Sequence, residues 1–154
     1  MSLLPALAAL RPDSWDFPLF LHVLGAMILV GGLLTSAAAL AFARGDARSL
    51  RLGYWSLLAV SLPGWVLMRV GAEWIYSREG LDDLPETPAW LDLGAFIADI
   101  GGVILLIALI AGGVGVRRLG TGRGSGLLKT TLVLSLVLLA AYVVAVWAMA
   151  GKPD

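Results

Sequence analysis

The stretch WLDLGAFIADIGGVILLIALIAGGVGV, residues 90–116, decides the fold of this chain. It exceeds the length of about 20 mainly apolar residues that a helix needs to cross the hydrocarbon core of a bilayer. Three further stretches, at residues 17–43, 54–77 and 127–150, meet the same requirement. We therefore expect an all-α protein, a transmembrane four-helix bundle that forms a single integral membrane domain over residues 1–154.

The composition agrees with a membrane protein. Of the 154 residues, 59% are hydrophobic and 14% are charged, whereas soluble domains average about 45–50% apolar and about 25% charged residues. The 11 basic residues equal the 11 acidic residues in number, so no excess of positive charge points to a nucleic acid. There is no cysteine, which excludes disulfides, iron–sulfur clusters and thiolate nucleophiles. The partner that the composition predicts is the lipid bilayer.

The charges of the connections predict the orientation of the helices. The connections at residues 44–53 and 117–126 are basic, while the middle one carries Arg78 among four acidic residues. Positively charged loops stay in the cytoplasm. We therefore expect a multi-pass protein with both termini outside, N-out/C-out, and with the acidic connection outside as well.

The strongly polar side chains of the spans are expected in their outer halves. At 1.5 Å per residue, Arg69 lies about 13 Å before the outer end of its helix and Asp99 about 14 Å past the outer start of its own. Glu73 follows Arg69 by one turn on the same helix face, and Asp92 lies near the outer end of the third span. Ionisable groups at this depth cost several kcal/mol unless they are paired, so we expect them to face the bundle interior or a wet cavity.

Two interpretations of this polar site remain open. Arg69, Glu73 and Asp99 form either an internal ion-pair network that fixes helix packing or a site for binding or proton relay. In the second case a proton, a metal ion or a cationic group supplies the positive charge that one arginine lacks. Asp92 alone suits a helix N-terminus, where the macrodipole stabilises a carboxylate. In either case we expect Arg69 within salt-bridge reach of Glu73 or Asp99.

His22 is the only histidine of the chain, about 7 Å into the first span from the same side. It is either a hydrogen-bonded packing residue or a metal ligand, and imidazole suits the iron of haem or a copper ion. Haem would need a dimer that brings two copies of His22 together, or a methionine such as Met149 or Met68 on the second axial side. The cofactor-binding candidates are therefore His22 and Met149, with His22 as the metal ligand.

The segment LHVLGAMILVGG, residues 21–32, resembles the first helix of small bacterial membrane families that open with Leu-His-x-Leu-Gly-Ala. These include copper-resistance-protein-D-like proteins and an uncharacterised family of integral membrane proteins. More distantly, the segment is similar to the membrane protoporphyrinogen oxidase family, whose early-helix histidine is associated with haem. The resemblance implies a four-helix protein of the bacterial cytoplasmic (inner) membrane and a ligand role for His22, and it supplies no activity.

Three functions from different classes stay open. The first is a membrane protein whose polar site in the outer half binds haem or copper. The second is a structural or scaffold subunit of a homo- or hetero-oligomeric membrane complex, which needs only packing. The third is a proton- or ion-coupled transporter, although the inner half of the spans, apart from Lys129 at its edge, carries no ionisable residue to continue a hydrated path. The sequence leaves open whether the protein is an enzyme.

Overall fold

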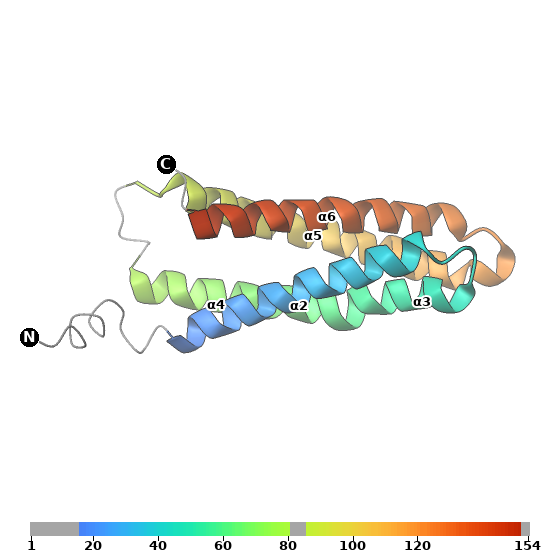
Figure 1. The fold of residues 1–154 in the computed structure, drawn as a ribbon, viewed down its shortest axis with the longest axis horizontal. Helices are drawn as coiled ribbons and strands as arrows, with labels where there is room; N and C mark the ends of the chain where they lie inside the picture. Colours follow the sequence, from blue (N-terminus) through green and yellow to red (C-terminus); the bar gives the residue numbers. More distant parts are fainter. Residues whose placement is uncertain (1–15, 81–85, 152–154) are drawn as a thin grey trace, which may run out of the picture.

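A computed structural model describes residues 16–80 and 86–151 of the chain, and these residues are helical apart from short connections. The elements are α2 (Asp16–Ala41), α3 (Ala47–Ser56), η2 (Leu57–Ser61), α4 (Leu62–Glu79), α5 (Ala89–Arg117), η4 (Leu119–Thr121) and α6 (Ser125–Gly151). The elements α3, η2 and α4 follow one another without a break and form one long helix (Figure 1). Four helices are thus long and apolar enough to cross a membrane, as the sequence predicts.

The four helices run alternately up and down. The start of α2, the end of α4, the start of α5 and the end of α6 lie at one end of the bundle, which we call the outer end (Figure 1). The connections from α2 to α3 and from α5 to α6 lie at the opposite end, which we call the inner end. Most of the acidic connection, with Asp82 and Asp83, lies outside the described residues.

The helix of the second span begins earlier than the predicted apolar run. It starts at Ala47, because Asp46 caps its first turn. The Asp46 carboxylate accepts hydrogen bonds from the backbone N–H of Ser49 at 2.8 Å and from its hydroxyl at 2.7 Å. Such a cap satisfies N–H groups that have no partner within the helix. Arg48 and Arg51, expected in a connection, therefore lie on a helix.

Pro63 shapes the middle of this span. Proline lacks an N–H group and its ring clashes with the carbonyl four residues earlier, so it disturbs a regular α-helix. The chain responds with the π-helical segment Leu57–Ser61, in which the N–H of Leu62 bonds to the carbonyl of Leu57, five residues back. Segments of this kind are rare and interrupt α-helices as single wide turns.

The bundle consists of two closely packed pairs of helices. Helix α2 packs most extensively against α4, and α5 against α6, while α4 and α5 touch each other at only a few positions. In Figure 1 the two pairs are apart at the outer end and converge toward the inner end. Contacts between α2 and α6 also join the pairs.

Glycines set the distance within the first pair. Three of them have the backbone of the facing helix where a Cβ would stand: Gly25 against Met68, Gly64 against Leu29, and Gly71 against His22. Small residues at such interfaces let membrane helices approach closely, which is needed because lipid gives no hydrophobic drive for association. The first pair is therefore held by backbone contact.

In the second pair, large side chains of α6 cover small residues of α5. Met149 lies on Gly94, Tyr142 on Gly101, and Leu128 on Gly115. These positions are seven and fourteen residues apart on both helices, multiples of the seven-residue spacing of left-handed coiled-coil packing. Leucines fill the centre between the pairs, and the fully buried ones are Leu29, Leu33, Leu57, Leu105 and Leu138.

Candidate functional site

Arg69 makes two ion pairs, one within α4 and one that joins α4 to α5. Its guanidinium nitrogen Nη2 lies 2.6 Å from Oε1 of Glu73 and 3.1 Å from Oδ1 of Asp99. Glu73 is one turn away on α4, and Asp99 belongs to α5. The predicted pairing of Arg69 with Glu73 or Asp99 is confirmed, and both partners are engaged. We call these three residues the outer cluster.

The carboxylates of the outer cluster face away from the chain. The side chain of Arg69 is 26% exposed, whereas those of Glu73 and Asp99 are 64% and 62% exposed. Of the two expected surroundings, the bundle interior is wrong for the two carboxylates of the single chain, and a wet cavity stays a prediction. The reason is the sparse contact between α4 and α5, which leaves the seam between the two helices open to the surroundings.

The outer cluster nevertheless lies deep in the span. Arg69 and Asp99 are each about 15 Å from the outer ends of their helices, and Glu73 is about 9 Å from its own. Helix α5, with 29 residues, is about 44 Å long, whereas the hydrocarbon core is about 30 Å thick. A centred helix thus places Asp99 about 8 Å below the edge of the hydrocarbon. Ionised carboxylates at such a depth require a protein or water environment.

Two aromatic residues support the cluster from within the bundle. Trp65 of α4 donates its indole N–H to the carbonyl of Ala98, next to Asp99, at 3.0 Å. Tyr142 of α6 is 3% exposed, and its hydroxyl has no hydrogen-bond partner among the described residues. This hydroxyl lies against Gly101 of α5, two residues after Asp99, so a polar group is buried in the core close to the cluster.

His22 takes part in the packing of α2 on α4. Its Nδ1 lies 3.0 Å from the backbone carbonyl of Met68. A carbonyl only accepts hydrogen bonds, so Nδ1 carries the proton in the neutral ring and Nε2 is the unprotonated nitrogen. This is the geometry of a hydrogen-bonded packing residue, one of the two interpretations that the sequence left open.

Met149 and Asp92 lie in other surroundings. The methyl group of Met149 rests on Gly94 in the seam between α5 and α6, whereas His22 lies in the seam between α2 and α4. Asp92 is exposed in the first turn of α5 and makes no ion pair with the described part of the chain. This placement suits a carboxylate that a helix N-terminus stabilises.

A resident haem or copper ion does not fit these side chains well. The imidazole of His22 and the thioether of Met149 serve two different helix interfaces, so they do not form an axial pair. The described residues contain no group of three His, Cys, Asp or Glu that could hold a metal ion. Haem or copper binding at His22 therefore stays a prediction.

The sequence did not single out Tyr142 and Trp65, because the predicted site rests on charged residues, His22 and methionines. A signal for Tyr142 was present on α6, where Thr131, Ser135 and Tyr142 are all buried at helical spacing. A polar row on an otherwise apolar helix indicates the side that faces other helices.

Comparisons with protein-family models, with curated proteins and with solved structures found no match to this chain. What the protein does has therefore to be inferred from its own side chains.

Proposed function

We propose that this protein is a structural subunit of a membrane complex and that its outer cluster docks on another polypeptide within the bilayer. The observation that supports this is the exposure of two carboxylates, that of Asp99 about 8 Å inside the hydrocarbon and that of Glu73 at its edge. Glu73 and Asp99 are both more than 60% exposed in the single chain, and ionisable residues in spans are almost always turned to protein or water. A neighbouring protein helix over the seam of α4 and α5 satisfies this requirement.

The charges of the outer cluster indicate the chemistry of that neighbour. One arginine faces two carboxylates, and the other basic residues of the chain lie near or beyond the helix ends. A second copy of the chain would bring the same negative excess to the contact. A partner helix with a lysine or arginine at this depth would neutralise it, so we favour a hetero-oligomeric complex in a bacterial cytoplasmic membrane, with both termini of this chain outside.

The transporter alternative has less support. The polar side chains buried toward the inner end are hydroxyls, and those of Ser56, Thr131 and Ser135 donate to backbone carbonyls, while that of Ser61 has no hydrogen-bond partner among the described residues. Ser56 donates to Gly32 at 2.8 Å, and Ser135 donates to Thr131 at 2.8 Å. Hydroxyls of this kind are the usual polar ties between membrane helices.

Site-specific photo-crosslinking in native membranes tests the proposal. A benzophenone amino acid at Phe96, exposed one turn before Asp99 on α5, is expected to crosslink to a second polypeptide. The same probe at Val143, exposed at a similar depth on α6, serves as the matched control and is expected to label lipid.

The crosslink at Phe96 should depend on the charges of the cluster. We expect it to disappear in the double variant Glu73→Gln and Asp99→Asn, and to persist in Asp92→Asn, which removes an exposed carboxylate outside the cluster. A crosslink that is insensitive to the double variant, or that forms equally from Val143, contradicts a docking role for the outer cluster.

A further inference from the structure

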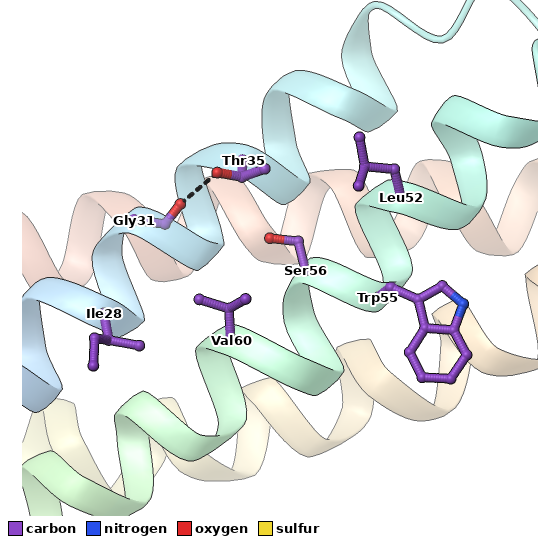
Figure 2. A pocket seen from close by; sticks show the side chains of 7 residues that line it. All are labelled: Ile28, Gly31, Thr35, Leu52, Trp55, Ser56 and Val60. Carbon is purple, nitrogen blue, oxygen red and sulfur yellow. Dashed lines mark hydrogen bonds between the residues drawn. The ribbon is translucent and has the colours of Figure 1, made fainter.

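An apolar groove opens between α2 and the segment of α3 and η2, away from the outer end. Its volume is about 510 Å³, and Figure 2 shows the side chains that line it: Ile28, Gly31, Thr35, Leu52, Trp55, Ser56 and Val60. The two hydroxyls of the lining donate to backbone carbonyls, that of Thr35 to Gly31 and that of Ser56 to Gly32, both at 2.8 Å. The groove therefore suits an apolar occupant.

A second hollow adjoins this groove at the inner end of the bundle. It measures about 410 Å³ and is lined by Arg48, Ser49, Arg51, Leu52 and Trp55. Leu52 and Trp55 line both cavities, so the apolar groove continues into a basic hollow. Trp55 stands where the two meet, which is the position that tryptophan prefers between apolar and polar layers of a membrane.

Gly31 keeps the groove open. A Cβ at Gly25 or Gly32, on the same helix, would collide with the α4 segment or with Ser61, whereas one at Gly31 would have no atom within 4 Å. The packing of the chain itself thus gives no reason for a glycine at position 31. Its effect is to deepen the groove on the lipid-facing side of α2.

The two arginines of the hollow, Arg48 and Arg51, can bind an anion. Neither guanidinium forms an ion pair with a residue in the described ranges. The nearby Asp46 interacts electrostatically with Arg48, but its carboxylate is held by the hydroxyl and the backbone N–H of Ser49. The hollow is therefore lined by two positive groups, and the nearby carboxylate of Asp46 is engaged in capping α3.

We propose that the groove and the hollow together bind one anionic phospholipid. Its phosphate lies between Arg48 and Arg51, and an acyl chain follows the groove past Trp55 toward Val60. The distance along the helix from Arg48 to Val60 is about 18 Å, which matches the half-thickness of about 15 Å of the hydrocarbon core. Basic side chains at a membrane surface attract anionic lipids, each by about a factor of five in affinity.

A second copy of the chain is the less suitable occupant. A helix of another copy would fill the apolar groove, but it would need acidic groups opposite Arg48 and Arg51. At the inner end the described part of the chain offers Asp46 alone, which already caps α3. The site lies away from the outer cluster and does not depend on the proposed docking role.

Native mass spectrometry of the full chain in a non-ionic detergent tests the proposal. We expect one phosphatidylglycerol to bind about 25-fold more tightly than phosphatidylcholine of the same chain length, from two guanidinium groups at about fivefold each. The double variant Arg48→Gln and Arg51→Gln should lose this preference. The matched control, Arg117→Gln and Arg118→Gln, removes two exposed arginines at the same end and should bind phosphatidylglycerol within twofold of the parent.

A groove-filling variant tests the apolar half of the site. Gly31→Leu places a side chain into space that is open in the fold, so the variant should fold and should bind both phospholipids at least tenfold more weakly. Gly126→Leu, at another helical glycine with no atom near its Cβ position, is the control and should bind as the parent does.

Four results would overturn the proposal. They are equal affinity for the two phospholipids, unchanged binding of phosphatidylglycerol in the Arg48 and Arg51 variant, and displacement of the lipid by millimolar inorganic phosphate, which has no acyl chain. The fourth is a parent dimer that Gly31→Leu dissociates while lipid binding persists, because the occupant of the groove would then be a helix of a second copy.

Discussion

Arg69→Met removes the guanidinium of the outer cluster and keeps an unbranched side chain of similar reach. Arg69 makes two ion pairs, at 2.6 Å and 3.1 Å, and both carboxylates are more than 60% exposed in the single chain. In detergent, where water reaches these carboxylates, exposed pairs contribute up to about 1 kcal/mol each, so the variant should lose up to about 2 kcal/mol. In the proposed complex the carboxylates would be covered, and breaking a buried pair costs about 3–5 kcal/mol.

Reversible unfolding in mixed micelles, followed by helical circular dichroism, measures the first of these values. Asp99→Asn tests which contact causes this loss of stability, because it removes the longer of the two ion pairs of Arg69. If the ion pair between Arg69 and Asp99 is the cause, the variant that carries both substitutions should lose less free energy of unfolding than the two single variants lose together. The difference should be about 0.5–1 kcal/mol. Asp92→Asn, on the same helix and without an ion pair to residues 16–80 or 86–151, should be additive with Arg69→Met.

The reasoning fails if Arg69→Met is as stable as the parent in micelles. It also fails if Asp99→Asn and Asp92→Asn change the free energy of unfolding equally when each is combined with Arg69→Met. The first result would show that the pairs stabilise nothing. The second would show that Arg69 acts through its general charge and not through the contact with Asp99.

Four further predictions follow from the fold. Reporter fusions at Asp46 and Asp83 should report opposite sides of the membrane, and a shared side would invalidate the orientation. His22→Ala should lower the free energy of unfolding by about 1 kcal/mol through loss of one hydrogen bond, and the purified parent should be colourless; a Soret band that this variant abolishes would restore the haem prediction. Gly71→Leu should prevent close packing of α2 on α4, whereas Gly31→Ala should be tolerated; equal unfolding midpoints would contradict the glycine contacts. The pKa of Asp46 is lowered, chiefly because the hydroxyl of Ser49 donates a hydrogen bond to its carboxylate. The stabilisation of the fold by this carboxylate should therefore be complete above its usual pKa of 3.8 and vanish as the pH falls through the lowered pKa. Asp46→Asn should remove this loss of stability at acid pH in a pH series of melting curves.

The four spans follow from the sequence because length and hydropathy alone determine which segments prefer the bilayer. The start of the second span was placed too late, since Arg48 and Arg51 look like loop residues to a hydropathy argument. Asp46, three residues before Ser49, is a capping pattern, and this pattern places the start of the helix at Ala47.

The pairing within the outer cluster was predictable for a similar reason. A fixed rise per residue places Arg69 and Asp99 at one depth once the helix ends are known. The direction in which Glu73 and Asp99 point was not predictable, because the helices are apolar on all sides and polarity does not mark the inner face. In this bundle the inner face is marked by residue size, with glycines such as Gly25 at the contacts.

The arrangement of the outer cluster lets a partner dock without leaving a charge unpaired. Arg69 holds Glu73 on its own helix at the shorter distance and reaches Asp99 across the seam at the longer one. A basic side chain from a partner can therefore take Asp99 while Arg69 stays with Glu73, so that four charges form two pairs. Because α4 and α5 touch at few other positions, such a partner would also close the seam at the end where the two helix pairs separate.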